Sequence, residues 1–315
     1  MTAEAFFQSP ILNSPYEEPS KHWEMLDGVA TGEVIQERRR ADFMTPIPRA
    51  KIFDQGKQPE LEGITEGFVK DGQEYTKDII NDIRSYVKEW RKLPKEMWGV
   101  TPETARLLEH WRNHKFLGIR PFFCQLEAVE IAIWLTEVAP KQKVGEKILH
   151  YLHKVNDEAN SGLPRLALKL ATGAGKTTVM AMLIAWQTVN SVKQSNRQKF
   201  TRGFVVVAPG ITIRDRLRVL LPNDPDSYYQ KRELVPVDML SAMQQARIVV
   251  TNYHTFKLRQ RFEVSKGTRA AIEGWRGETL NSLETEGEML QRVMPELMNL
   301  RRVMWIGTRE AGQPL

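Results

Sequence analysis

The glycine-rich stretch LATGAGKTT, residues 170–178, has the residue types that can hold the phosphates of a nucleotide. Gly173 and Gly175 let the backbone approach phosphate oxygens, because they carry no Cβ. A helix that begins at such a turn directs free N–H groups and partial positive charge to one point. Lys176 can reach the β- and γ-phosphates, and the Thr177 hydroxyl can bind Mg²⁺. The predicted nucleotide-binding residues are Thr172, Gly173, Ala174, Gly175, Lys176, Thr177 and Thr178. The strict pattern has glycine where Leu170 stands.

The surrounding pattern alternates strands and helices, as a phosphate-binding turn requires. RLALKLATG predicts a strand that enters the turn, and residues 177–191 predict the helix that leaves it. Further strands are predicted at FVVVAP, ARIVVTNYHTF and RRVMWIG. Helices are predicted at 122–137, 143–156, 212–221 and 286–300. This alternation indicates an α/β fold, a parallel sheet with helices on both faces and right-handed crossovers.

The first part of the chain does not show this alternation of strands and helices. Residues 1 to about 75 are rich in Pro, Gly and charge and predict loops, including SPYEEPSKHW and TPIPRAKIF. Helices follow at 75–92 and 102–114, the second with Thr101 as N-cap. We therefore predict two parts, a leader at 1–115, loop-rich and then helical, and an α/β domain at 116–315.

Composition narrows the protein class. The chain has 315 residues and a formal net charge of +6, which suits a polyanionic partner without requiring one. Cys124 is its only cysteine, so an intramolecular disulfide and a cysteine-rich metal site are excluded. The N-terminus does not resemble a secretory signal, and the apolar runs are too short to cross a bilayer. These features predict a cytoplasmic protein with no membrane association.

Four motifs in a fixed order make the resemblance to a known family specific. RPFFCQLEAVE, LATGAGKTT, FVVVAPGITIRDRL and ARIVVTNYHTF resemble the first motor domain of superfamily 2 (DEAD/DEAH-box) helicases, and most closely the Res subunit of type III restriction enzymes. The resemblance implies an incomplete RecA-like P-loop NTPase domain with ATP and Mg²⁺ as cofactors. It implies ATP hydrolysis that drives translocation along double-stranded DNA for endonucleolytic restriction, together with a modification (methyltransferase) subunit as partner. In such proteins the first motif position is often not glycine.

The resemblance also implies roles that the residues alone would not. Gln125, with Arg120 and Phe122 nearby, would read adenine; taken alone, Gln125 is an ordinary solvated residue. Two strand ends would contact DNA, through Pro209, Gly210 and Arg214 and through Thr251, Asn252 and Tyr253. The basic residues Lys193, Arg197, Lys199 and Arg202 are interpreted as a solvated linker.

Catalytic residues are not assigned. The family has two acids directly after the strand RRVMWI, and here GTREAGQPL follows, with Arg309 at the position of the first acid. No acid-x-Lys nuclease triplet occurs in the chain. These features predict a truncated or frame-disrupted product, or a fragment that another polypeptide completes. Two alternatives remain: an inactive nucleotide-binding remnant or docking module, and a different P-loop enzyme such as a small-molecule kinase.

Overall fold

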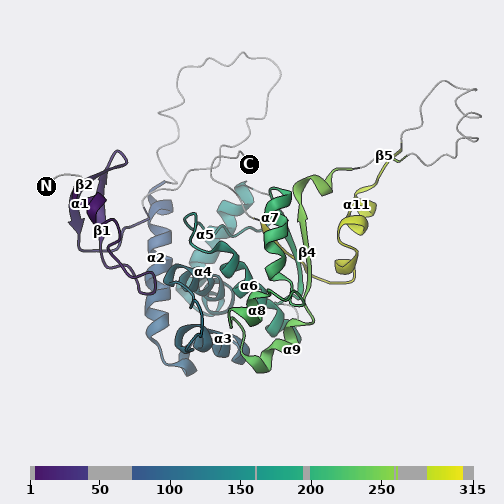
Figure 1. Cartoon of the computed structure of the whole chain (residues 1–315), viewed down its shortest axis with the longest axis horizontal. Helices are drawn as coiled ribbons and strands as arrows, with labels where there is room; N and C mark the ends of the chain where they lie inside the picture. The colour runs from purple at the N-terminus through teal and green to yellow at the C-terminus, as the bar shows by residue number, and fades with distance from the viewer. Residues whose placement is uncertain are drawn as a thin grey trace, which may run out of the picture. The chain divides into compact units, whose positions relative to one another are not determined.

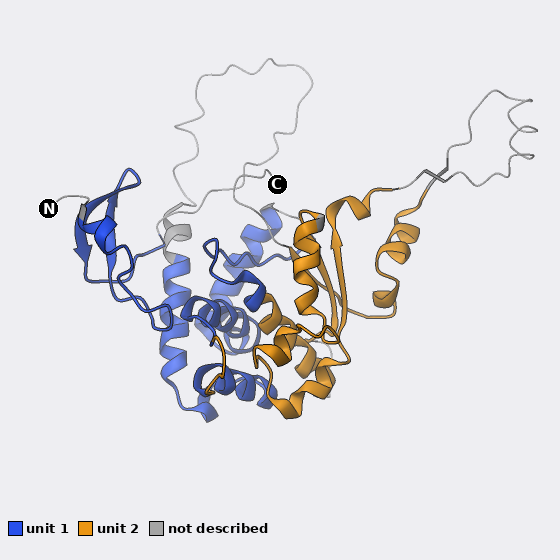
Figure 2. Ribbon diagram, in the orientation of Figure 1, with its two compact units in different colours: residues 1–113, 120–179 blue, residues 114–119, 180–315 orange. Residues whose placement is uncertain are grey.

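The computed structural model describes residues 4–41, 73–159, 162–193, 199–258, 260–261 and 282–307 (Figure 1). The chain divides into two compact units, shown separately coloured in Figure 2. Unit 1 contains residues 1–113 and 120–179, and unit 2 contains residues 114–119 and 180–315. The leader boundary near residue 115 stays a prediction.

Three helices form the core of unit 1: α2 (Gln73–Lys92), α3 (Pro102–Asn113) and α4 (Phe123–Ile133). On α2, Val87 and Trp90 are buried at helical spacing. The N-cap of α3 is confirmed, because the Thr104 amide donates to the Thr101 Oγ1 atom at 3.2 Å. The helices predicted at 75–92 and 102–114 are therefore present.

The predicted helix at 122–137 is present with a change of geometry. After α4 the chain widens into a π-helical turn, Trp134–Val138, and a 3₁₀ turn, Ala139–Lys141, before α5 (Lys143–Ala159) begins. The buried Glu137 carboxylate in the π turn accepts the Thr101 N–H at 2.8 Å and the Thr104 hydroxyl at 2.7 Å. The π turn thus places an acid at the N-terminus of α3, where the helix dipole favours negative charge.

The first forty residues are more regular than the sequence predicts. A short helix, α1 (Glu4–Gln8), precedes an antiparallel hairpin of β1 (His22–Leu26) and β2 (Val29–Ile35). Asp27 and Gly28 connect the strands with positive φ at both positions, 49° and 83°, as a two-residue hairpin turn requires. The TPIPRAKIF segment lies outside the described residues.

Unit 2 contains a parallel three-stranded sheet in the order β4-β3-β7. Its strands are β3 (Gly203–Ala208), β4 (Arg247–Asn252) and β7 (Met304–Gly307), which confirms three predicted strands. The β-branched run of β3 is buried almost throughout, as expected for a central strand. Val205 packs in a cluster with Met294 and Leu297.

Helices and short strands connect the sheet strands of unit 2. α6 (Lys176–Lys193) begins in unit 1 and continues into unit 2. The predicted helix at 212–221 is shorter, α7 (Ile211–Arg216) followed by a 3₁₀ turn. The predicted helix at 286–300 ends at Val293 as α11 (Glu286–Val293), two residues before Pro295. The remaining elements are α8 (Tyr228–Lys231), α9 (Leu240–Met243), β5 (Gln260–Arg261) and β6 (Ser282–Leu283).

The prediction of a strand that enters the glycine-rich turn is wrong. Residues 163–171 have no regular secondary structure and pair with no strand among the described residues. Leu166 is 51% exposed there. Alternating leucines favour a strand only where a neighbour supplies hydrogen bonds and a packing surface, and no described segment supplies either.

None of the described helices combines the length and the apolar character that crossing a bilayer needs.

Candidate functional site

The glycine-rich turn of unit 1 has the backbone geometry that a phosphate cradle needs. Gly173 and Gly175 have φ angles of 82° and 77°, which side chains with a Cβ rarely adopt. The Ala174 N–H donates to the Ala171 carbonyl at 3.2 Å, which closes the turn. α6 then begins at Lys176, so the N-terminus of an 18-residue helix opens directly at the turn.

The polar side chains of the turn differ in exposure. Lys176 Nζ donates to the Ala171 carbonyl at 3.1 Å and so folds back over its own loop. Thr172 is exposed and Thr177 is half-buried. Thr178 is 3% exposed, so its hydroxyl faces the protein interior, although it belongs to the predicted nucleotide-binding set.

Gln125 makes a contact with the turn that joins positions 49 residues apart in the sequence. Its Oε1 accepts the Phe122 N–H at 3.0 Å, and its Nε2 donates to the Ala174 carbonyl at 2.8 Å. The side chain is 4% exposed, and a Cβ at position 175 would lie 2.2 Å from Nε2. Gln125 is therefore a buried link between the start of α4 and the glycine-rich turn, not a solvated residue.

The leader contributes residues next to Gln125. The Phe123 N–H donates to the Pro15 carbonyl at 2.8 Å. The Tyr16 ring makes an edge contact with Phe122, with centroids 5.5 Å apart, and the Arg120 guanidinium lies 4.1 Å from the Tyr16 ring centroid. The predicted neighbours Arg120 and Phe122 are thus grouped with Gln125, and Tyr16 joins them. Nothing in the sequence spacing indicates this contribution.

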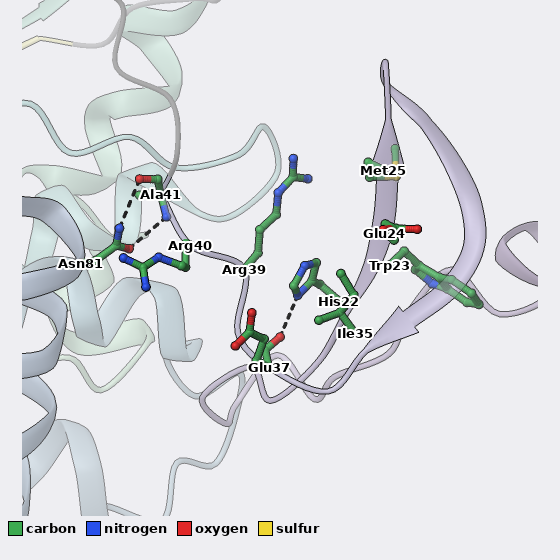
Figure 3. Close-up of a pocket in the computed structure, with 10 residues that line it drawn as sticks. All are labelled: His22, Trp23, Glu24, Met25, Ile35, Glu37, Arg39, Arg40, Ala41 and Asn81. Carbon is green, nitrogen blue, oxygen red and sulfur yellow. Dashed lines mark hydrogen bonds between the residues drawn. The ribbon is translucent and has the colours of Figure 1, made fainter. Parts of the chain in front are cut away.

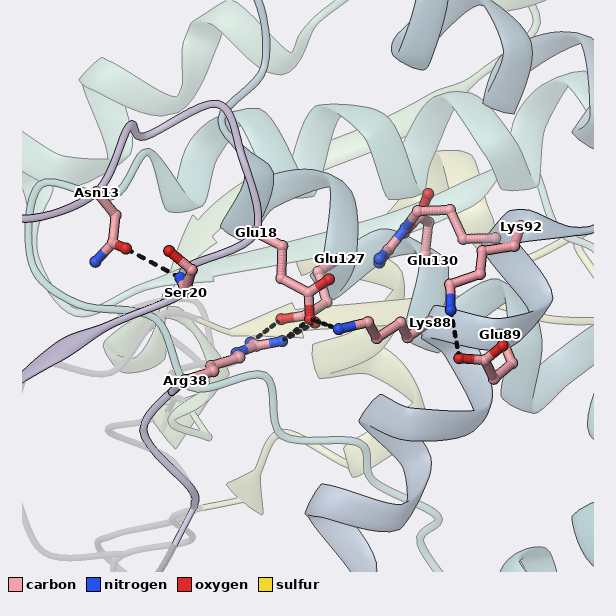
Figure 4. A network of polar contacts seen from close by, with 10 residues as sticks. Asn13, Glu18, Ser20, Arg38, Lys88, Glu89, Lys92, Glu127 and Glu130 are labelled. Carbon is pink, nitrogen blue, oxygen red and sulfur yellow. Dashed lines mark hydrogen bonds and ion pairs between the residues drawn. The ribbon is translucent and has the colours of Figure 1, made fainter. Parts of the chain in front are cut away.

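Two carboxylates of α4, Glu127 and Glu130, join this helix to neighbouring segments (Figure 4). Glu127 binds the Arg38 guanidinium with two hydrogen bonds of 2.7 and 2.6 Å, and Glu18 pairs with both Arg38 and Lys88. The hydrogen bond to Glu127 raises the pKa of Arg38. Because Arg38 follows the hairpin and Glu127 lies on α4, this network anchors the leader beside the Gln125 link.

The second carboxylate, Glu130, is almost completely buried. Its two oxygens accept hydrogen bonds from Arg91 Nε on α2 and from Arg112 Nε on α3, each at 2.8 Å. The guanidinium of Arg112 lies 4.5 Å from the Trp98 ring centroid. One acid thus joins α2, α3 and α4, and the tryptophans of this region pack in the core as structural residues.

In unit 2 the predicted DNA-contact residues follow two paired strands. β3 and β4 are parallel and in register, with Ala208 opposite Asn252. Gly210 and Tyr253 therefore emerge at the same edge of the sheet, as carboxyl ends of parallel strands do. Arg214 pairs with its neighbour Asp215 and stays 44% exposed, and Tyr253 is 68% exposed. Pro209 directly precedes Gly210 in this loop.

Two residues of the second predicted DNA-contact motif, Thr251 and Asn252, have their side chains engaged within the protein itself. Thr251 is 6% exposed within β4. Asn252 Oδ1 accepts the Thr255 N–H at 3.1 Å and the Thr255 hydroxyl at 2.7 Å, so Asn252 caps the 3₁₀ turn Tyr253–Phe256. The side chain that this arrangement presents is Tyr253, which can stack on a base or lie along a phosphate backbone.

Arg292 of α11 supports the same turn. It donates to the Thr255 carbonyl at 3.1 Å and to the Lys257 carbonyl at 3.2 Å, and Glu284 binds it with two hydrogen bonds of 2.8 Å. The hydrogen bond to Glu284 raises the pKa of Arg292. The sequence contains no motif that would identify Arg292 or Glu284.

Replacement of Asn252 by alanine is expected to lower the free energy of unfolding of unit 2 by about 1 kcal/mol, the usual effect of losing a cap. Hydrogen exchange at the Thr255 amide should accelerate, because that amide loses its acceptor. Asn252→Asp keeps the oxygen and should restore both values, and Asn299→Ala, at an exposed position, is the matched control. Unchanged exchange at Thr255 in Asn252→Ala would show that the cap is unimportant.

Among the described residues no three His, Cys, Asp or Glu side chains gather as metal ligands. The one predicted metal-binding residue, Thr177, is the second residue of α6, and its role stays a prediction. The segment 308–315, where Arg309 stands at the position of the family's acid, lies outside the described residues.

Comparison with known proteins identifies one family. No curated protein and no solved structure matches the chain. The model of the family described as "Type III restriction enzyme, res subunit" matches residues 124–281. The match covers half of the 315 residues and includes Gln125, the glycine-rich turn and both strand-end motifs. This protein therefore belongs to the type III restriction enzyme res subunit family, a family of helicase-like ATPases.

Proposed function

We propose that this chain is the ATP-binding and DNA-binding part of an ATP-dependent DNA translocase that serves restriction. ATP and Mg²⁺ are the proposed cofactors, double-stranded DNA is the proposed substrate, and a modification methyltransferase subunit is the proposed partner. In this proposal the parallel sheet of unit 2 is part of an incomplete RecA-like domain. Family membership supports the proposal at the level of a helicase-like ATPase.

The observation that carries the proposal is the Gln125–Ala174 hydrogen bond of 2.8 Å. It joins the residue predicted to read adenine to the turn predicted to hold the phosphates. A glycine-rich turn that binds no nucleotide is not expected to form a hydrogen bond with the Gln125 side chain in particular. In this proposal the adenine-reading residue and the phosphate-binding turn form two adjacent halves of one nucleotide site within unit 1.

The residues present fit MgATP. Positive-φ glycines and the start of α6 give a cradle of backbone N–H groups, and no heavy atom lies within 4 Å of a Cβ placed at Gly173. Lys176 would exchange its bond to the Ala171 carbonyl for phosphate oxygens, and the Thr177 hydroxyl would face the metal. Bound Mg²⁺ supplies neutralisation of phosphate charge. No residue of the chain is assigned as a catalytic acid or base.

The DNA-contact group is proposed to follow the phosphate backbone without reading sequence. Gly210 offers a backbone N–H, Arg214 offers a guanidinium that is 44% exposed, and Tyr253 adds an exposed ring. Such contacts give binding that weakens as salt rises, because each bound phosphate releases counterions.

Lys176→Ala is expected to weaken ATP binding by a factor of roughly 10 to 150, which corresponds to the 1.5–3 kcal/mol of a hydrogen bond to a charged group. The measurement is titration with a fluorescent ATP analogue. Lys169→Ala removes the same charge from an exposed position seven residues earlier and is the control. Equal affinities of the two variants would refute the phosphate-binding role.

The alternative function is a nucleotide-binding remnant or a docking module without turnover. The observation that favours it is in the sequence, where Arg309 stands at the position of the family's first acid. DNA-stimulated ATP hydrolysis that disappears in Lys176→Ala would exclude this alternative, and ATP binding without hydrolysis at any DNA concentration would support it.

A further inference from the structure

The loop of residues 13–21 contacts the start of α4 and lies outside the segment that the family model matches. One side chain closes this loop, because Asn13 Oδ1 accepts the Ser20 N–H at 3.0 Å and Asn13 Nδ2 donates to the Lys21 carbonyl at 2.8 Å. Figure 4 shows the bond between Asn13 and Ser20. Loop 13–21 therefore has a defined shape without a ligand.

Ion pairs and hydrogen bonds fix this part of the chain to α2. The Glu18 carboxylate of the loop pairs with Lys88 of α2 at 3.2 Å and with Arg38 at 3.6 Å. Beyond the hairpin, the Ala41 N–H donates to Asn81 Oδ1 at 3.0 Å, and Asn81 Nδ2 donates to the Ala41 carbonyl at 3.3 Å (Figure 3). Binding of a ligand beside the loop therefore requires little further ordering of the backbone.

The loop supplies one of the acceptors that the start of α4 needs. The first N–H groups of a helix have no partner within the helix. The Phe123 N–H donates to the Pro15 carbonyl at 2.8 Å, and the preceding amide, that of Phe122, donates to Gln125 Oε1 at 3.0 Å. The loop and the Gln125 side chain thus hold adjacent amides of one helix start.

These bonds fix which way the Gln125 amide points. Oε1 faces the Phe122 N–H and Nε2 faces the Ala174 carbonyl, so a flipped amide would lose both hydrogen bonds. An amide in a fixed orientation can pair with the amino group and N7 of adenine, whereas guanine has an acceptor in place of the amino group. Whatever holds Phe122 in place therefore affects the choice between the two bases.

The Tyr16 ring holds Phe122 and a second side chain. It makes an edge contact with the Phe122 ring, with centroids 5.5 Å apart, and the Arg120 guanidinium lies 4.1 Å from the Tyr16 ring centroid. Arg120 is exposed, whereas Gln125 is 4% exposed. A buried amide offers a base no flat surface, but a planar guanidinium held over an aromatic ring does.

We propose that Tyr16 sets the preference of the proposed nucleotide site for adenine. It is a positioning residue, which acts through Phe122 on the orientation of the Gln125 amide and through Arg120 on the surface against which the base lies. This role rests on the proposed function, because a base site of this kind needs the phosphate-binding turn beside it. The sequence before α4 then determines base selectivity, although it lies outside the family match.

The test is isothermal titration calorimetry of the full chain with ATP, GTP and inorganic triphosphate. The parent chain should bind ATP more tightly than GTP. Tyr16→Ala should weaken ATP binding roughly 3- to 10-fold, the size of one or two ring contacts, and should bring the ATP and GTP affinities close together. The affinity for inorganic triphosphate, which has no base, should stay unchanged. Tyr16→Phe keeps the ring and should keep the preference for ATP.

Arg120→Ala tests the same role at an exposed position, where folding does not depend on the side chain. It should reduce the preference for ATP in the same way as Tyr16→Ala. The double variant should lose less than the sum of the two single variants, because both changes remove the same stacked pair.

Phe7→Ala is the matched control. Phe7 is an exposed aromatic residue of α1 whose ring contacts Phe6, with centroids 5.5 Å apart, and its loss should leave all three affinities unchanged. Lys176→Ala should weaken binding of ATP, GTP and inorganic triphosphate by the same factor, which separates the phosphate contact from the base contact.

Two results would contradict these expectations in different ways. A parent chain that binds ATP, with the same ratio of ATP to GTP affinity in Tyr16→Ala and Arg120→Ala, would overturn the role of Tyr16 and leave the proposed function intact. A parent chain that binds neither ATP nor inorganic triphosphate would overturn the proposed function and the role of Tyr16 with it.

Discussion

Gly175→Ala is expected to lower the free energy of unfolding of unit 1 by about 2–4 kcal/mol. The alanine pays about 1–2 kcal/mol for a left-handed backbone, because φ at this position is 77°. Its Cβ would also lie 2.2 Å from Gln125 Nε2 and force the amide away from the Ala174 carbonyl. Gln125 cannot simply swing aside, because the side chain is buried and bonded at both ends, and a buried group without a partner costs about 1–3 kcal/mol.

Gly173→Ala is the matched control for this prediction. Gly173 has φ of 82°, but no heavy atom lies within 4 Å of its added Cβ, so the variant has the backbone strain without the clash. Chemical denaturation should give a clearly lower free energy of unfolding for Gly175→Ala than for Gly173→Ala. In a Gln125→Ala background the difference between the two glycine variants should nearly disappear. Equal free energies of unfolding of the two glycine variants in the parent background would show that the Gln125–Ala174 hydrogen bond does not stabilise unit 1.

Glu130→Ala is expected to cost about 3–5 kcal/mol of unfolding free energy, the usual result of removing one partner of a buried ion pair. Glu130 is 1% exposed and receives two arginines from two different helices. Without the carboxylate, Arg91 and Arg112 would face each other in a site of low polarity. Arg91 also lies 5.1 Å from the Phe123 ring centroid, so the start of α4 should loosen as well.

The control for Glu130 is Glu109→Ala. Glu109 forms an exposed ion pair with Lys95, and such pairs contribute about 0–1 kcal/mol. Thermal or urea unfolding of both variants gives the comparison. If Glu130→Ala lost no more stability than Glu109→Ala, the three-helix junction would owe its stability to apolar packing alone.

Local sequence signals predicted the parts of the fold that depend on local chemistry. The β-branched run of β3 and the apolar spacing of α2 each identify their element, because burial on one face or on both imposes the pattern. Thr101 identified the start of α3, because a cap bonds to an amide three residues away. Asp27-Gly28 also carried a hairpin signal, although the short strands on either side lack clear alternation.

Contacts between distant residues could not be predicted in this way. The glycine-rich turn was recognisable, but its bond to Gln125 spans 49 residues and no spacing rule connects the two positions. The roles of Arg292 and Tyr16 likewise depend on the tertiary fold. The strand predicted at RLALKLATG failed for the same reason, since a strand exists only with a partner and the sequence does not say whether one is adjacent.

The Arg38–Glu127 pair joins positions 89 residues apart, one after the hairpin and one on the helix that carries Gln125. Loss of Arg38 would leave the Glu127 carboxylate partly buried without this partner, and loss of Glu127 would leave Arg38 with Glu18 alone, 3.6 Å away. The position of Arg38 after the hairpin and the charge of Glu127 on α4 therefore stabilise each other. Replacing the segment before residue 41 by one without this arginine would therefore take away a counter-ion of the helix that carries Gln125.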